Sequence, residues 1–405
     1  MDSAISTAAR ALSVGDPLAA LKHVALRRDP SALALRGIAL AQLGEWSKSL
    51  LLLRRAAKAF GDAEPLARAR AVVAAAEVSL VLRDLRGAAR GLDEAVGQLS
   101  RRGDVANAAF ARLVQVRRLV LLGQVDAAEQ ALGQLRIEGA PARLVALASL
   151  ISADLAMKRV RAALAESALL DAERAARASR IPALLSEVES ARQRLATPVA
   201  RLQQAGRERN VGLAELEQLL ASGAFLVDAC RREVRQGTRV ASLVTRPVLL
   251  ELLLALAETA PLEVARHALI LRVFGARRAN DSHRVRLRVE VGRLRRLLLG
   301  LAELKATASG FALLPRGGQP TLLLPPEGGE ASELWALLRG GEAWATSALG
   351  SALGKSQRSV QRALAELERD GKVRSAGDGR ARRWVATPGP GFATSLLLVA
   401  PGTLG

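Results

Sequence analysis

The 405-residue sequence is poor in the residues that most often carry chemistry or build aromatic cores. It has one cysteine, three histidines and no tyrosine, and aromatic residues make up only 2% of it. The lone Cys230 excludes an intramolecular disulfide framework and a cysteine-based zinc site, so we expect it to be a small core residue. Cores must instead be built from Leu, Ala and Val, which favours closely packed helices over β-sandwiches.

Long apolar runs are missing as well. No apolar stretch reaches the roughly 18–20 residues that span a bilayer. The first residues also lack the basic-then-apolar order of a secretory signal peptide. We therefore expect a soluble, cytoplasmic protein.

Motifs of catalytic and nucleotide-binding sites are missing too. His23, His267 and His283 are scattered without metal-ligand spacing, and the sequence contains no P-loop, no GxGxxG after a strand and no GxSxG. Asp and Glu occur mostly on charged helix faces, where they can pair with Arg. The sequence thus predicts neither an enzyme nor a bound cofactor or metal.

Positive charge is what the sequence has in excess. Lys and Arg number 59 against 39 Asp and Glu, a formal net charge of +20 with a pI near 11.4. Such a charge attracts polyanions, with nucleic acid as the first candidate partner and an anionic membrane surface as the second. A GC-rich genome, which favours Arg over Lys, would explain part of this excess.

The first half, residues 1–220, is predicted to be an array of helices. Apolar residues recur at i, i+3, i+4 and i+7, and Pro and Gly stand mainly at the joints. A short turn pattern repeats every 29 to 40 residues, a spacing typical of helix-pair solenoids. Its copies begin at Val14, Leu43, Leu82, Leu122, Met157 and, in a weak form, Leu195.

The best copy, residues 33–60, resembles a tetratricopeptide repeat. The residues near that family's pattern are Gly37, Leu40, Leu43, Gly44, Trp46 and Ala56. The resemblance implies a scaffold that binds a protein or peptide or forms a homodimer, although an array that only spaces or stabilises the rest stays possible. With 29 basic against 20 acidic residues up to Arg194, the array is suited to an acidic segment.

Residues 222–316 change to a mixed pattern. Apolar and polar residues alternate from 224 to 243 around a turn at 236–237, which predicts a β-meander. A helix opens at Pro247 and a second ends at Gly275. A long basic helix then starts after a cap at Asp281 or Ser282, and two short strands follow around residues 309–310.

This order resembles the effector domain of OmpR/PhoB-type response regulators, a winged helix-turn-helix that binds double-stranded DNA. The matching residues are Asp228, Arg246, Pro247, residues 249–254, Ala268, Leu269, residues 273–275, residues 289–297, Thr307, Gly310 and Phe311. Two features depart from that family. The wing is short and lacks its Arg, and no receiver domain with a phosphorylatable Asp precedes it, so control by aspartyl phosphorylation is not expected.

The basic helix is predicted to lie in a major groove. At 100° per residue, Leu287, Val291, Leu294 and Leu298 share one face and should be core. On the opposite face, Arg286 or Arg293 could donate two hydrogen bonds to guanine O6 and N7, and Val289 could contact a thymine methyl group. The family resemblance implies base contacts at Val289 and Arg293. Flanking Arg284, Arg288 and Arg295 would meet phosphates or Glu290. The predicted DNA contacts here are Arg284, Arg286, Val289, Arg293 and Arg296, with Lys305 and Thr307 in the wing.

After a predicted linker, residues 317–329, a second winged domain is expected over residues 330–390. It resembles small repressors of the MarR or ArsR kind, on Ala352, Leu353, Gly354, Ser356, Arg358, Val360, Arg362, Leu364, Leu367, Gly371 and Val373. Its third helix, capped by Ser356, would direct Arg358, Gln361 and Arg362 outward, and its turn would offer Arg380, Arg382 and Arg383 to DNA. Residues 391–405 suggest one more strand.

Taken together, these patterns predict a mainly α protein: a tetratricopeptide-like helical solenoid followed by two winged helix-turn-helix domains. The function expected is that of a sequence-specific, double-stranded DNA-binding transcription regulator, associated with the nucleoid and without a membrane partner. The alternative is a non-catalytic scaffold whose winged domains make only protein contacts.

Overall fold

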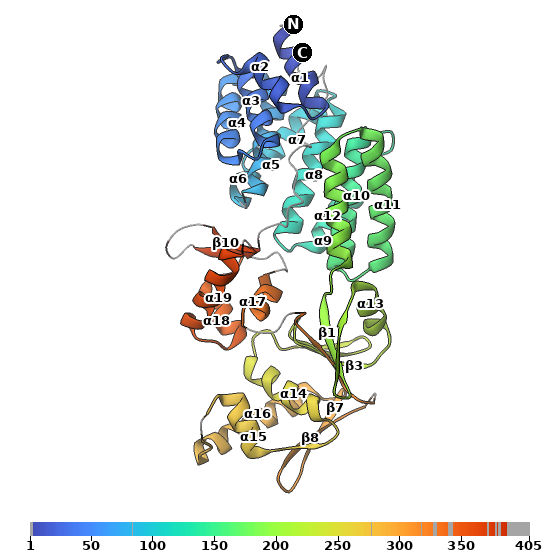
Figure 1. Cartoon of the computed structure of the whole chain (residues 1–405), viewed down its shortest axis with the longest axis vertical. Helices are drawn as coiled ribbons and strands as arrows, with labels where there is room; N and C mark the ends of the chain where they lie inside the picture. Colours follow the sequence, from blue (N-terminus) through green and yellow to red (C-terminus); the bar gives the residue numbers. More distant parts are fainter. Residues whose placement is uncertain are drawn as a thin grey trace. The chain divides into compact units, whose positions relative to one another are not determined.

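The computed structural model describes residues 3–82, 84–276, 278–316, 318–326, 330–338, 343–370, 372–376, 379 and 382–386. The protein is mainly helical, as predicted, with three small sheets among these residues (Figure 1). Among the described residues, those up to Leu195 form one compact unit and residues 196–386 form a second. The strand predicted over residues 391–405 lies outside the described residues.

The first unit consists of helices joined by short turns. They are α1 (Ser3–Ser13), α2 (Pro17–Val24), α3 (Pro30–Gln42), α4 (Trp46–Phe60), α5 (Pro65–Val81), α6 (Leu85–Ala89), α7 (Leu92–Arg101), α8 (Val105–Leu121), α9 (Val125–Gly133), α10 (Ala142–Lys158), α11 (Ala162–Ser179) and α12 (Pro182–Ala196). Several helices begin at residues that favour a helix start. At α3, for example, the Asp29 carboxylate accepts a hydrogen bond from the backbone N–H of Ala32, and Pro30 is the first helical residue.

The recurring sequence pattern falls at turns between helices. Gly15, Gly44 and Gly123 adopt φ values of 80°, 80° and 74°, the left-handed region in which glycine carries no steric cost. Small residues also permit close packing, since a Cβ added at Gly37 of α3 would lie 2.7 Å from Leu53 Cγ of α4. The copy expected at Leu195 is different: α12 ends at Ala196 and a strand follows.

The second unit contains strands where the sequence predicted helix or linker. Its six-stranded sheet has the order β2-β1-β9-β3-β4-β5. The strands are β1 (Ala200–Gln204), β2 (Arg207–Val211), β3 (Phe225–Asp228), β4 (Glu233–Gln236), β5 (Arg239–Ser242) and β9 (Thr321–Leu324). The helical array therefore stops before residue 220, at a hairpin whose turn residues Ala205 and Gly206 both have positive φ. The predicted meander over β3, β4 and β5 is confirmed.

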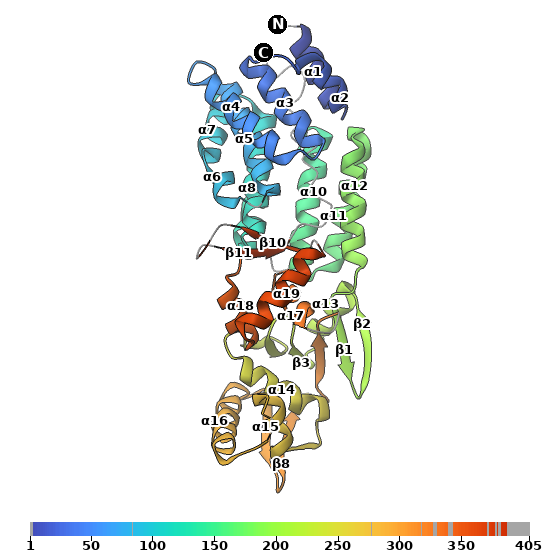
Figure 2. The same ribbon diagram turned by 60° about the vertical axis from the view of Figure 1, so that its left-hand side comes forward.

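A helical layer packs beside this sheet and a second, three-stranded sheet. It comprises α14 (Pro247–Thr259), α15 (Arg266–Phe274) and α16 (Asp281–Leu297), and the small sheet has the order β6-β8-β7. Its strands are β6 (Glu263–Ala265), which the sequence did not predict, β7 (Ala302–Ala306) and β8 (Gly310–Pro315). Helix α13 (Leu213–Ala221) lies between β2 and β3 in the chain. Figure 2 shows α14, α15 and α16 grouped close to β8.

The last described elements are α17 (Glu330–Leu338), α18 (Thr346–Leu353), α19 (Gln357–Arg369), β10 (Val373–Ala376) and β11 (Arg383–Ala386). β10 and β11 pair antiparallel, as predicted, and Ser356 caps α19 by accepting from the N–H of Ser359. Val360, Leu364 and Leu367 are buried in a core with Trp384, on the side of α19 opposite the residues predicted to point outward. Cys230 is only half-buried, so it is not the core residue expected.

Candidate nucleic-acid interface

Helix α16 is held by its apolar face. Leu287, Val291, Leu294 and Leu298 are each at most 2% exposed and belong to one core with α14 and the small sheet, which confirms the predicted inner face. The helix begins one residue earlier than expected, because the Asn280 side chain is the N-cap and accepts from the N–H of His283 at 2.9 Å. Burial of one face fixes the opposite face toward solvent.

That outward face has the shape and charge expected of a helix that enters a groove. Val285 and Val289 are 59% and 48% exposed, an unusual position for valine. Apart from the neighbouring helix backbone, no atom lies within 4 Å of a Cβ built at Gly292, so there is open space at this point of the helix surface. All five predicted α16 residues are exposed: Arg284, Arg286, Val289, Arg293 and Arg296.

Several of these arginines are oriented by contacts within the protein. The Arg286 guanidinium lies 4.6 Å from the ring centroid of Phe274, a cation–π arrangement. Arg293 Nη1 lies 2.8 Å from Glu290 Oε1, and Arg284 Nη1 lies 3.2 Å from Asp281 Oδ1. No ion pair involves Arg296 within the described residues.

The partner of Glu290 differs from the prediction. We expected a flanking arginine, Arg284, Arg288 or Arg295, but Arg293 takes this role because it is three residues away on the same side of the helix. Arg295 instead donates from Nε to the carbonyl of Leu304 at 2.9 Å and so ties α16 to β7. Glu290 is buried, and its carboxylate holds the exposed Arg293 side chain against the helix.

Of the two residues of the β7–β8 hairpin that were predicted to contact DNA, one is available to a ligand and the other is used within the turn. Lys305 is exposed, but the Thr307 hydroxyl accepts from the N–H of Gly310 at 2.9 Å and closes the turn. Sequence reasoning missed Arg266, the first residue of α15. Its guanidinium donates to the carbonyls of Ala308 and Thr307 at 2.8 and 2.9 Å and lies 5.3 Å from the Phe311 ring.

A second basic surface lies on α19 and the β10–β11 pair. Arg358, Gln361 and Arg362 are exposed, opposite the buried residues of that helix. Arg382 donates to Ser375 Oγ at 3.1 Å and stands 4.8 Å from the Trp384 ring, while Arg383 is half-buried and donates to the Arg382 carbonyl. Arg380 lies outside the described residues.

The first unit holds a buried ionic cluster that the sequence did not predict. Arg117 Nη1 of α8 lies 3.3 Å from Glu77 Oε1 of α5, and Glu187 of α12 is also buried. Burial raises the pKa of Glu77 to about 8; Arg117 opposes this shift and Glu187 adds to it. The adjoining cavity of about 40 Å³ suits no more than a water or two, so the cluster is a structural feature.

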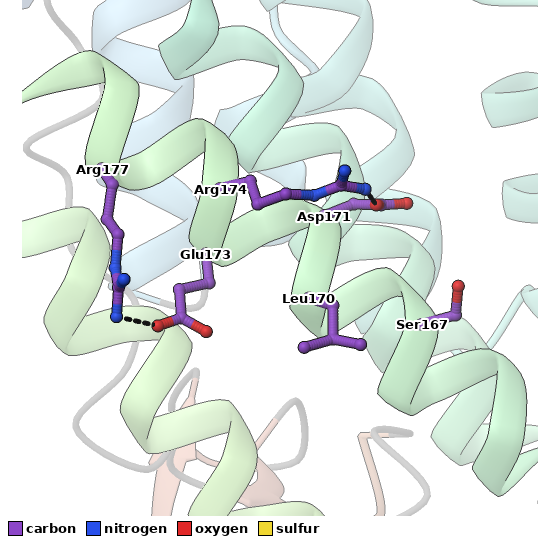
Figure 3. Close-up of a pocket in the computed structure, with 6 residues that line it drawn as sticks. All are labelled: Ser167, Leu170, Asp171, Glu173, Arg174 and Arg177. Carbon is purple, nitrogen blue, oxygen red and sulfur yellow. Dashed lines mark hydrogen bonds and ion pairs between the residues drawn. The ribbon is translucent and has the colours of Figure 1, made fainter.

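A shallow hollow of about 340 Å³ lies along α11 (Figure 3). Its charged groups are paired with one another, Arg174 with Asp171 and Arg177 with Glu173. All of its lining residues come from one helix, so the hollow has no second wall that would enclose a substrate. In the described part of the chain, no group of three His, Cys, Asp or Glu residues is placed to hold a metal ion.

Comparisons with known proteins returned nothing: no protein-family model, curated protein or solved structure matches this chain. Of the helices that the structure describes, none has both the length and the apolar character needed to cross a bilayer.

Proposed function

We propose that this protein is a sequence-specific regulator of transcription that binds double-stranded DNA through α16. In this proposal, β3 to β8 form an OmpR/PhoB-like winged helix-turn-helix, and α17 to β11 form a second winged domain of the MarR or ArsR kind. The observation that carries the proposal is the division of α16 into a buried leucine and valine face and an exposed arginine face.

The exposed face matches what a major groove offers. A guanidinium can donate two hydrogen bonds to guanine O6 and N7, and an exposed valine can contact the thymine methyl group. Arg286 and Arg293 are suited to the first role and Val289 to the second. The bare backbone at Gly292 would let the helix approach the base edges closely.

Contacts within the protein do not remove these arginines from use. The ion pair of Arg284 is at the surface, where such pairs contribute about 0–1 kcal/mol and exchange readily for phosphate. The Arg293 side chain is itself exposed, although its partner Glu290 is buried. The stacking of Arg286 on Phe274 orders its side chain before binding, which lowers the entropy lost on contact with DNA.

The helices α1 to α12 are assigned to sensing or oligomerisation. We propose that they form a tetratricopeptide-like array that binds a protein or peptide or a second copy of the chain. A protein with this function would work in the cytoplasm on the nucleoid. No catalytic step and no cofactor are proposed.

Binding of the full chain to a labelled 30-base-pair duplex of mixed sequence at low salt tests the proposal. Non-specific affinity in the micromolar range or better is expected from phosphate contacts alone. The Arg174→Ala variant, changed on the exposed surface of α11, should bind as well as the unmodified chain.

A scaffold function is the second candidate. It is favoured by the engagement of Thr307 and Arg382 in contacts within the protein, which leaves fewer free groups in the two turns. Absence of duplex binding at low salt would contradict the first candidate and favour the scaffold.

A further inference from the structure

We infer that the two proposed DNA-binding domains are joined as one body and therefore recognise a duplex that carries two motifs at a single fixed spacing. This inference rests on the proposed function. It goes beyond that function, which does not fix how the two domains are joined. Two domains on a flexible tether would bind motifs at many spacings, whereas two rigidly joined domains would require one.

The segment predicted as a linker is largely built into the fold. Strand β9, residues 321–324, is the third strand of the six-stranded sheet and pairs with both β1 and β3. Leu322 and Leu323 are 2% and 1% exposed. After the strand, Arg201 Nε donates to the carbonyl of Pro325 at 3.0 Å, and α17 begins at Glu330. Few residues remain to act as a tether.

The domains also touch directly. Gly354, at the end of α18, has a φ of +65°, and a Cβ added there would lie 2.9 Å from Cβ of Pro247. Pro247 is the first residue of α14, so the end of α18 abuts the start of α14. Glycine at this position serves both the left-handed backbone and the close contact.

Charges from both domains meet near this contact. Arg232, in the turn between β3 and β4, is 5% exposed. Burial lowers the pKa of its guanidinium, while the carboxylates of Glu333 on α17 and Glu251 on α14 act against that shift. Glu333 Oε2 in turn lies 2.9 Å from Lys355 Nζ. Carboxylates of both domains therefore act on Arg232.

Helix α14 connects this joint to the candidate interface. It contacts α18 at one end and packs against α15 and α16. Since α19 packs on α18, a displacement of α19 relative to α16 would break the packing at Gly354 or the contacts along α14. DNA presents equivalent groove faces every 10 to 10.5 base pairs, so a rigid pair of readers would match one helical phase.

The experiment uses the full chain and a pool of synthetic duplexes with a randomised core of about 40 base pairs. Repeated selection and sequencing are expected to yield two motifs separated by one dominant spacing. Inserting 5 base pairs between them, about half a helical turn, should weaken binding by about tenfold or more, because only one domain can then engage. The same insertion outside the motifs is the matched control and should change nothing.

Contrary outcomes separate this inference from the function on which it rests. Two motifs at many spacings, a tolerated 5-base-pair insertion, or a single motif would each overturn the rigid joint while leaving sequence-specific DNA binding in place. A pool with no enriched sequence would instead overturn the proposed function, and this inference with it.

The Glu333→Lys variant tests the joint from the protein side. It places a third positive charge beside Arg232 and Lys355 and should loosen the contact. The selected motifs should stay the same, while the penalty for the 5-base-pair insertion should fall to about threefold or less. An unchanged penalty in a folded variant would count against the joint. If the variant fails to fold, the spacing comparison on the unmodified chain still decides.

Discussion

At the scale of single residues, Glu77 has an unusual environment for a carboxyl group, because it is buried among apolar helices. It is a fully buried carboxyl whose Oε1 meets Arg117 and whose Oε2 has no hydrogen-bond partner in the described structure. One guanidinium faces two carboxylates, because Glu187 is buried in the same cluster. Burial raises the pKa of Glu77 to about 8, so this carboxyl holds its proton to higher pH than an exposed glutamate does.

A pH dependence of stability follows from Glu77. Between its ordinary pKa of 4.5 and about 8, the folded state keeps a proton that the unfolded state releases, so stability falls as pH rises through this window. The Glu77→Gln variant removes this contribution and should show a flatter decline of its urea midpoint between pH 5.5 and pH 9. The exposed Glu166→Gln change is the control. Equal slopes in Glu77→Gln and the unmodified chain would show that burial does not perturb this carboxyl.

Arg293 and Arg288 should affect DNA binding in different ways. Arg293→Ala removes a proposed guanine contact and should cost about 1–3 kcal/mol and relax the preference at one base pair. Arg288 lies to the side of the exposed face, so Arg288→Ala should weaken binding to all sequences alike. Selection of duplexes from a random pool with each variant distinguishes the two effects. An unaltered preference in Arg293→Ala would show that the base-reading face is assigned incorrectly.

At the scale of elements, the helices could be predicted and four strands could not. The periodic leucines and the caps Asp29 and Ser356 mark helices locally, so α3 and α19 follow from the sequence. β9 is a short apolar run without alternation, because both of its faces are covered in the sheet centre. β6 takes its conformation from β8, which lies more than 40 residues further along the chain, and periodicity does not register such a partner. β1 and β2 form a local hairpin whose turn at Ala205 and Gly206 the sequence pattern did not mark.

In the candidate site as well, local features could be predicted from the sequence and contacts between elements could not. The exposed and buried faces of α16 follow from 100° per residue, because its leucines and valines recur at helical spacing and pack into one apolar core. The partners of Arg286 and Arg266 come from other elements, Phe274 in α15 and the hairpin carbonyls. Such contacts depend on how elements pack, so the sequence left Arg266 unnoticed.

Arg266 is expected to stabilise the β7–β8 hairpin. It donates two charge-assisted hydrogen bonds to the turn and covers Phe311. Because the side chain is partly solvent-exposed, Arg266→Ala should lower the free energy of unfolding by about 1–2 kcal/mol. Urea denaturation measures this loss, with the exposed Arg278→Ala as the control. A loss no larger than that of the control would mean that the turn holds without Arg266.

At the scale of the whole molecule, basic residues outnumber acidic ones in both units. The first unit has 29 basic and 20 acidic residues, and the rest of the chain has 30 and 19. Net charge alone therefore does not locate the DNA-binding surface. In the second unit, the arginines of α16 share a face with exposed valines and with Gly292, and this arrangement is the basis on which α16 is proposed to bind DNA.

The salt dependence of duplex binding, compared between the unmodified chain and an Arg286→Ala, Arg293→Ala, Arg296→Ala triple variant, tests the central claim most directly. Each phosphate neutralised by a cation contributes about 0.9 to the slope of log affinity against log salt. The triple variant is expected to bind at least about tenfold more weakly and to show a slope shallower by about one to three. A charge-matched triple variant at Arg101, Arg102 and Arg174 should keep the affinity and slope of the unmodified chain. Equal affinity and slope in the α16 variant and the unmodified chain would contradict the assignment of α16 as the DNA-binding helix.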